Sequence, residues 1–193
     1  MNIIDLLTEK QKQALVYRKY EAKVHVFNEN DFCDCIGIVC KGHLDIVSYL
    51  QDGKQIIYNS MQENQIFGGN LIFSSNPYFK GNIIAGCDCI IAFINQKQLI
   101  EFLQTNTDFM IEYLKKQADF TKQLNDNIKI MSISNMEERL YYLLKINNGK
   151  IKYETISGLA QKLYMQRETL SRLISKLEKQ SKIKKENHCI FHI

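Results

Sequence analysis

The segment TISGLAQKLYMQRETLSRLISKLEKQ, residues 155–180, is the most informative part of the sequence about the fold of the C-terminal region. Apolar residues recur at helical spacing in two blocks, 155–163 and 167–180, and Tyr164, Met165 and Gln166 separate the blocks as a turn. The stretch predicts two helices with a common core, followed by a short basic hairpin at 184–193. The residues expected in that core are Ile156, Leu159, Ala160, Leu163, Leu170, Leu173, Ile174 and Leu177.

The second of these helices leaves a polar face outside the core. Positions 168, 171, 172 and 175 follow the i, i+3, i+4, i+7 rule and therefore lie on one side of the helix. An α-helix fits the major groove of DNA, where arginine donates two hydrogen bonds to guanine and glutamate accepts one from cytosine. Glu168 costs electrostatic affinity for DNA, so its place on this face indicates base reading. Spacing alone leaves open the alternative of a solvated polar face.

Basic residues are concentrated towards the C-terminal end of the chain. From Ser134 onward there are 12 Lys and Arg against 6 Asp and Glu, whereas the residues before it have 13 against 15. A near-neutral first part and a basic second part favour a nucleic-acid-binding domain at the C-terminal end.

Short β-branched segments between residues 15 and 94 are typical of strands in a small barrel or jelly roll. Asp52-Gly53 is a hairpin turn signal, and Gln51 precedes it. Residues 2–14 are expected to form one short amphipathic helix. The segments expected as strands are 24–27, 35–40, 44–50, 54–58, 83–85 and 89–94.

A short helix is expected at 96–103. The segment 107–133 is expected to form one long helix, because it holds neither Pro nor Gly. Its heptad pattern predicts a seam that is buried against a second copy of the chain. A helix that packs on its own barrel is the alternative. The seam residues are Met110, Leu114, Gln117, Thr121, Leu124, Ile128 and Met131.

The rest of the composition points to an intracellular protein. No apolar run approaches the roughly 18 residues that a membrane span needs, and the N-terminal residues lack the pattern of a signal peptide. We therefore expect a cytoplasmic location and no membrane partner. The six cysteines fit free thiols in that compartment better than a disulfide framework.

The segment QRETLSRLI, residues 166–174, followed by Leu177-Glu178-Lys179-Gln180 and Ile183, resembles the recognition helix of the Crp/Fnr family of bacterial transcription regulators. Four earlier segments are similar to the barrel of that family: 39–42, 52–54, 66–68 and 85–94. The resemblance covers nearly the whole chain and implies an α+β fold. Its expected parts are a double-stranded β-helix (jelly-roll) effector barrel of the cyclic-nucleotide-binding type at 1–104, a dimerisation helix at 105–133 and a winged helix-turn-helix at 134–193.

The resemblance also implies how the chain contacts DNA. Arg167, Glu168 and Arg172 match the base-reading residues of the Crp branch, and Glu168, Ser171 and Arg172 match the Glu-x-x-Ser-Arg of the Fnr branch. The expected partners are double-stranded DNA with a palindromic site and a TGA-like core in each half, a second copy of the chain, and RNA polymerase. The full set of expected DNA-binding residues is Gln166, Arg167, Glu168, Ser171, Arg172, Lys176, Lys184 and Lys185.

The barrel departs from the cyclic-AMP-binding members of the family. Where those members hold ribose with Gly-Glu and phosphate with Arg-Ser, this chain reads Gly68-Gly69 and Phe79-Lys80, although Lys80 keeps one positive charge. The missing carboxylate and guanidinium remove the ribose contact and the bidentate phosphate clamp. Leu124-Asn125 replaces the Thr-Ser that meets the base. The effector is therefore unknown and is not expected to be cyclic AMP; its pocket is expected at Gly68, Gly69, Asn70, Phe79, Lys80, Leu124 and Asn125.

Other sensing chemistry stays open on the same scaffold. An iron–sulfur cluster of the Fnr type is not expected. Such a cluster needs four thiolates, several of them near the N-terminus, whereas the first cysteine of this chain is Cys33. Residues two apart in a strand share a face, so two pairs of thiols are expected to lie together: Cys33 with Cys35, and Cys87 with Cys89. Each pair could serve redox or metal sensing, and the alternative is that these cysteines are buried as small hydrophobic residues. The histidines show no metal-ligand spacing, and a single haem ligand remains an alternative.

Two other classes of protein are the alternatives to a transcription regulator. A jelly-roll metalloenzyme needs closely spaced histidines, but His25 and His43 are the only ones in the barrel, so neither catalytic nor metal-binding residues are predicted. A ligand-binding adaptor that has lost DNA binding is the other alternative, and the intact Arg167, Glu168 and Arg172 argue against it.

Overall fold

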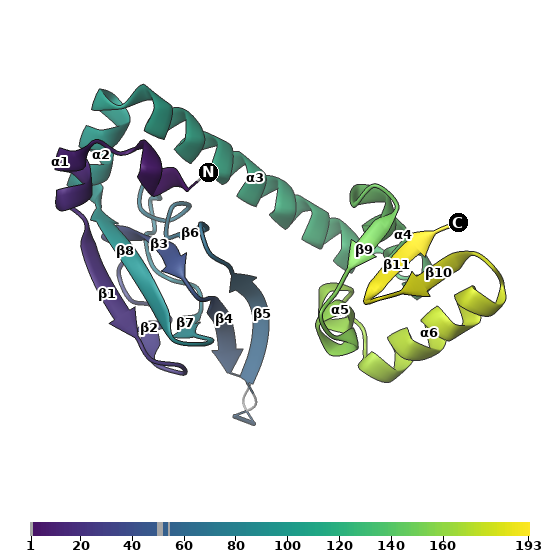
Figure 1. Cartoon of the computed structure of the whole chain (residues 1–193). Helices are drawn as coiled ribbons and strands as arrows, with labels where there is room; N and C mark the ends of the chain where they lie inside the picture. Colours follow the sequence, from purple (N-terminus) through teal and green to yellow (C-terminus); the bar gives the residue numbers. More distant parts are fainter. Residues whose placement is uncertain (1, 50–51, 54) are drawn as a thin grey trace. The chain divides into compact units, whose positions relative to one another are not determined.

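The computed structural model describes residues 2–49, 52–53 and 55–193 (Figure 1). Leu50, Gln51 and Lys54, which the sequence places at the ends of two strands and in their turn, lie outside the described residues. By its internal contacts the chain divides into two compact units, 1–119 and 120–193, which are described separately below. None of the helices in the described part of the chain combines the length and the apolar character that crossing a membrane requires.

The first unit is built from two four-stranded antiparallel sheets, with strand orders β1-β8-β3-β6 and β2-β7-β4-β5. This jelly-roll architecture is the one that the sequence predicts. The strands are β1 (Val16–Tyr20), β2 (His25–Phe27), β3 (Cys35–Lys41), β4 (Leu44–Tyr49), β5 (Gln55–Met61), β6 (Ile66–Phe67), β7 (Asn82–Ala85) and β8 (Cys89–Asn95).

Aromatic rings from both sheets meet inside the barrel. Phe27 of β2 stacks on Phe79 with ring centroids 4.5 Å apart, and its ring edge meets Phe67 of β6 at 6.1 Å and Phe93 of β8 at 6.2 Å. Gly37 of β3 makes room for this cluster, because a Cβ there would lie 2.0 Å from the Phe67 ring. These rings bury apolar surface from both sheets in a single core.

Short helices accompany the barrel at its N-terminal and C-terminal ends. The sequence predicts one helix over 2–14, but the structure has a 3₁₀ helix η1 (Ile3–Leu6) and a separate α1 (Glu9–Gln13). The prediction was wrong because Thr8 is extended and caps α1 by accepting a hydrogen bond from the backbone N–H of Gln11. After β8, Asn95 caps α2 (Gln96–Thr105), which α3 (Thr107–Ser132) follows.

The second unit combines the C-terminal half of α3 with a small helical domain and a three-stranded sheet, β10-β11-β9. The strand β9 was not predicted, because only one of its three residues is apolar. Asn148 and Gly149 take positive φ angles of 54° and 80° directly after α4, and this left-handed backbone ends the helix. The elements are α4 (Met136–Ile146), β9 (Lys150–Lys152), α5 (Ile156–Lys162), α6 (Arg167–Lys179), β10 (Ile183–Glu186) and β11 (Cys189–His192).

Candidate functional site

The turn between α5 and α6 fixes the direction of α6. Thr155 caps α5 by accepting a hydrogen bond from the Gly158 N–H at 3.0 Å. Tyr164 then adopts a left-handed conformation with φ 52°, and the Met165 N–H returns to the carbonyl oxygen of Ala160 at 3.0 Å. The two helices therefore leave the turn as a compact pair, as residues 155–180 predict.

The apolar face of α6 is anchored in the core of the second unit. Leu170, Ile174 and Leu177 are at most 2% exposed and recur at i, i+4 and i+7, so they lie on one side of the helix. They join the buried residues Leu159, Ala160 and Leu163 of the α5 segment. Ile156 and Leu173 are partly buried against this core. The predicted core is therefore confirmed, and α6 presents its remaining face outward.

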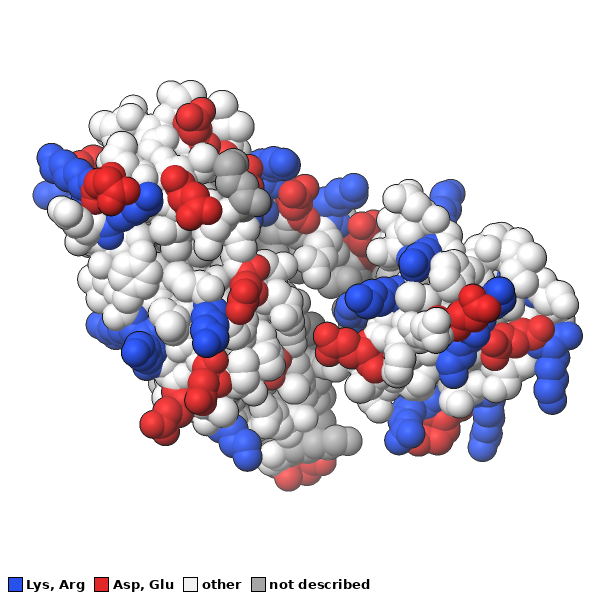
Figure 2. Space-filling view, viewed as in Figure 1, with Lys and Arg blue, Asp and Glu red and all other residues white. Residues whose placement is uncertain are grey.

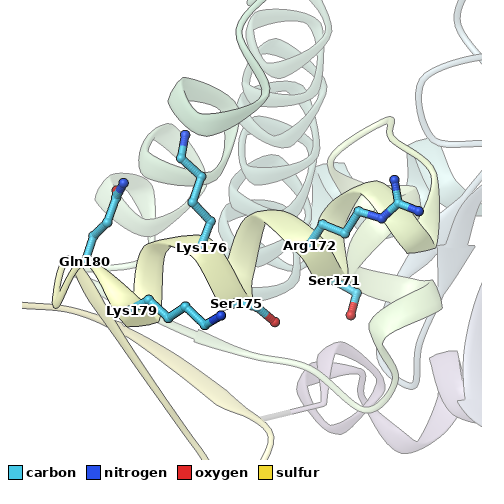
Figure 3. Close-up of a pocket in the computed structure, with 6 residues that line it drawn as sticks. All are labelled: Ser171, Arg172, Ser175, Lys176, Lys179 and Gln180. Atoms are coloured by element: carbon cyan, nitrogen blue, oxygen red, sulfur yellow. The ribbon is translucent and has the colours of Figure 1, made fainter.

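The outward face of α6 carries the predicted reading residues. Arg167, Glu168, Ser171 and Arg172 are all exposed. Figure 3 shows two rows of side chains along the helix, one with Arg172, Lys176 and Gln180 and the other with Ser171, Ser175 and Lys179. A shallow hollow is lined by the same six residues. Ser175, Lys179 and Gln180 were not in the predicted set of DNA-binding residues, although spacing placed position 175 on the polar face. For Lys179 and Gln180 the available signal was their i+4 spacing from Ser175 and Lys176.

Two of the predicted cations around α6, Lys176 and Lys184, have carboxylate neighbours, and so does the nearby Lys182. Glu137 of α4 lies 3.1 Å from Lys182 and 3.5 Å from Lys176, and Lys184 lies 2.7 Å from Glu186. The hydrogen bond from Lys182 holds the pKa of Glu137 below its usual value, and the same contact raises the pKa of Lys182. Lys176, Lys184 and Lys185 are all exposed. Figure 2 shows several Lys and Arg side chains projecting along one edge of the second unit, with carboxylates between them.

Arg139 is a residue that sequence reasoning missed. From α4, its Nη1 donates to the carbonyl oxygens of Leu163 and Tyr164 at 3.2 and 2.9 Å. Its Nε donates to the carbonyl oxygen of Ile133, and its Nη2 to that of Met131 at 3.5 Å. One guanidinium thus joins the end of α3 to the turn that precedes α6.

The predicted seam on α3 is partly exposed within the single chain. Leu114, Ile128 and Met131 are 55–64% exposed, and Leu124 is 40% exposed. Gln117 instead covers the barrel loop at Gly69, where a Cβ would come 2.4 Å from its Nε2. Met110 is half-buried and Thr121 is exposed.

The predicted effector residues fall into two groups. Gly68 and Gly69 belong to the loop after β6, and the Tyr113 hydroxyl of α3 donates to the Gly69 carbonyl oxygen at 3.3 Å. Phe79 is 3% exposed within the aromatic cluster, while Asn70 and Lys80 are exposed. Leu124 and Asn125 are exposed side chains on the part of α3 that belongs to the second unit.

The cysteine pairs do not have the strand geometry that the sequence suggested. Cys33 precedes β3, and Cys87 lies in the turn before β8, so neither pair sits two apart within one strand. Burial raises the pKa of Cys33 to about 11 and that of Cys35 to about 12. Among the described residues, no group of three or more His, Cys, Asp or Glu is placed to hold a metal ion.

Comparison with known proteins identifies the barrel and the overall architecture. Residues 17–106 match the cyclic nucleotide-binding domain family. The chain is 22% identical over 173 residues to the cAMP-activated global transcriptional regulator CRP of Pasteurella multocida, covering 84% of this chain and 82% of that protein.

Two solved structures share the fold along nearly the whole chain. A CooA variant from Carboxydothermus hydrogenoformans has a TM-score of 0.75 at 16% identity, covering 100% of this chain and 91% of that one. FixK2 from Bradyrhizobium japonicum has a TM-score of 0.63 at 16% identity, covering 93% of this chain and 92% of that one. The chain therefore carries a cyclic nucleotide-binding domain and has the architecture of the Crp/Fnr family of transcription regulators.

Proposed function

We propose that this protein is a sequence-specific DNA-binding transcription regulator whose α6 enters the major groove. The observation that carries the proposal is the two-sided character of α6. Its apolar side is fixed in the core by Leu170, Ile174 and Leu177, while Arg167, Glu168 and Arg172 are exposed on the same rigid helix. A reading helix needs both properties, because base contacts require side chains held at a defined position and orientation.

The exposed residues have the chemistry that base edges require. Arg172 and Arg167 each offer a planar fork of donors that matches the O6 and N7 acceptors of guanine. The carboxylate of Glu168 can only accept hydrogen bonds, and the matching donor on a base edge is the cytosine amino group. Together with the resemblance of residues 166–174 to the Crp/Fnr recognition helix, these residues favour a TGA-like core in each half-site.

The basic hairpin and the residues next to it would supply contacts to DNA phosphates that do not depend on the base sequence. Lys182, Lys184 and Lys185 lie at or within β10, which follows α6 directly. The ion pairs of Lys182 and Lys184 are solvent-exposed, so a DNA phosphate can replace the carboxylate partner at little cost. These lysines would position the domain on the backbone and make the affinity depend on salt.

We infer a homodimer from the seam on α3. Apolar side chains at heptad positions of α3 are exposed to solvent within the single chain: Leu114, Ile128 and Met131. The same helix of a second copy would bury them. Two copies related by a twofold axis would present two α6 helices, which matches a palindromic site. RNA polymerase is the further partner that this family architecture suggests.

We propose an effector other than cyclic AMP. The Pasteurella relative is named as cAMP-activated, but this chain has Gly69 and Phe79 where cyclic-AMP-binding members carry a carboxylate and a guanidinium. Gln117 covers Gly69, and Phe79 stacks on Phe27 inside the barrel. These neighbours provide neither the ribose contact nor the phosphate clamp.

Selection from a random pool of double-stranded DNA tests the proposed function. The purified full-length protein, first without added effector and then with a small-molecule extract, should enrich one palindrome with TGA-like half-sites. A protein carrying Lys19→Ala, which removes an exposed cation from the barrel, should enrich the same sequence. Failure to enrich any sequence under both conditions would reject the proposal and favour a ligand-binding adaptor.

A further inference from the structure

A cysteine and a histidine meet on the barrel of the first unit. Cys87 lies in the turn between β7 and β8, and its Sγ is 3.2 Å from Nδ1 of His43. His43 directly precedes β4, which pairs with β7 in the register Leu44 to Ala85. The Gly86 N–H also donates to the His43 carbonyl oxygen at 3.0 Å. Sheet pairing therefore brings together two residues that are 44 positions apart in the chain.

A carboxylate lies on the other side of the His43 imidazole, at a distance longer than a hydrogen bond. Its Nε2 is 4.0 Å from Oδ2 of Asp45, and Oδ1 of Asp45 accepts a hydrogen bond from the Ser60 hydroxyl. The ring lies directly over Gly86, where a Cβ would come 2.1 Å from Nε2. Glycine is thus required for this placement. The arrangement runs from a thiol through an imidazole to a carboxylate, the order in which a nucleophile is activated by an oriented base.

The other thiols have different surroundings. The Cys33 thiol donates to the carbonyl oxygens of Cys35 and Gly68, and the Cys40 thiol to that of Ile38. Burial raises the pKa of Cys33 to about 11, that of Cys35 to about 12, and also those of Cys40 and Cys89. Thiols of this kind remain protonated at neutral pH and react slowly. Cys87, which is half-buried, is the described cysteine for which the structure gives a histidine partner.

We propose that Cys87 is a reactive thiol which a hydroperoxide oxidises to a sulfenic acid, with His43 as general base and Asp45 as the residue that positions the imidazole. His43 Nδ1 takes the thiol proton, and the sulfur attacks one peroxide oxygen. The S–O bond forms as the O–O bond breaks. The released hydroxide or alkoxide takes the proton from the imidazolium and leaves as water or alcohol. Sulfur is oxidised by two electrons and the peroxide is reduced by two.

Oxidation can be measured at each cysteine separately. The reduced full-length protein is treated with hydrogen peroxide in the presence of dimedone, and the adducts are quantified by peptide mass spectrometry. A disulfide between Cys87 and Cys89 in the same digests is counted as Cys87 oxidation. We expect Cys87 to react about tenfold or more faster than Cys40 and Cys189, because general-base assistance contributes at least this much. Equal rates at these three cysteines would overturn the proposal.

Variants test the role of the imidazole. His43→Gln should slow the oxidation of Cys87 by about tenfold or more, and Asp45→Asn should slow it less. His25→Gln changes an exposed histidine of the same sheet, which contacts Asn28, and should leave the rate unchanged. Circular dichroism verifies that each variant is folded. A folded His43→Gln protein in which Cys87 is oxidised at an unchanged rate would contradict the proposal. If that variant does not fold, the comparison of oxidation rates among the cysteines of the original protein decides. The readout does not depend on DNA binding.

Discussion

Arg139 Nη1 donates a hydrogen bond to the carbonyl oxygen of Tyr164 at 2.9 Å, at the turn that sets the direction of α6. The same guanidinium also contacts the carbonyl oxygens of Ile133 and Met131, at the end of α3. These carbonyls lie at helix ends, where backbone acceptors lack partners within the helix. Arg139 therefore connects the candidate dimerisation helix to the candidate reading helix inside the second unit.

Arg139→Ala should destabilise the second unit and weaken DNA binding. The charged hydrogen bonds are lost and several backbone acceptors are left without this donor, so the free energy of unfolding should fall by roughly 1–3 kcal/mol. Urea unfolding followed by circular dichroism measures this change. Arg139→Lys keeps one charge but not the fork of donors, and should recover only part of the stability. An unaltered unfolding midpoint in Arg139→Ala would show that the contact is not structural.

Glu168→Gln should loosen base discrimination while strengthening binding to unrelated DNA. The carboxylate repels the phosphate backbone, so its removal raises non-specific affinity. The amide of glutamine is neutral and donates as well as accepts, so it should select cytosine less strongly, and up to about 1–3 kcal/mol of preference is lost at one base pair. Fluorescence anisotropy on specific and scrambled duplexes measures both quantities. Glu154→Gln, an equal charge change at an exposed site in the same unit, is the control. A lower affinity for scrambled DNA in Glu168→Gln would run against this reading.

Ile128→Glu should convert a dimer into monomers. Ile128 is 64% exposed on α3, and two glutamates facing each other across a helix seam repel and oppose its burial. Sedimentation velocity gives the mass in solution. Gln123→Glu places the same charge on an exposed position of α3 outside the predicted seam and should stay dimeric. A dimeric Ile128→Glu protein would place the self-association surface elsewhere.

Acid should weaken the second unit through Glu137. Because Lys182 lowers the pKa of Glu137 in the folded state, its contribution to stability is present above the unfolded pKa of about 4.3 and is lost as the pH falls through the lowered value. Glu137→Gln should therefore have a lower melting temperature than the original protein at pH 7, with the difference closing towards about pH 3. Glu138→Gln, which removes a carboxylate from the same first turn of α4, is the matched control. A pH-independent difference would mean that the carboxylate charge is not involved.

Local patterns predicted most of the fold. The periodicity of residues 155–180 and their turn gave α5, α6 and their core, because both helices bury one face against each other. The patterns failed where a single cap or a distant partner decides the structure. Thr8 splits the N-terminal helix through one side-chain hydrogen bond, and β9 exists because Ile151 pairs with Ile190 in β11.

The candidate site was predictable to the extent that its residues share one helix. Spacing alone placed Glu168, Ser171 and Arg172 on one face of α6, and the family resemblance added Arg167. Arg139 was missed because its partners are backbone carbonyls, which no side-chain motif reports. His43 and Cys87 were likewise missed as a pair, since only the register of β4 with β7 brings them into contact.

Arg172 is proposed to read one base pair in each half-site, and its base preference can be measured directly. Affinities are determined for the selected palindrome and for each single-base-pair change, using the original protein, Arg172→Ala and the control Lys19→Ala. Arg172→Ala should lose about 1–3 kcal/mol of discrimination at one base pair of each half-site, with discrimination kept at the other base pairs and in the control. Full discrimination at every base pair in Arg172→Ala would contradict the placement of α6 in the major groove.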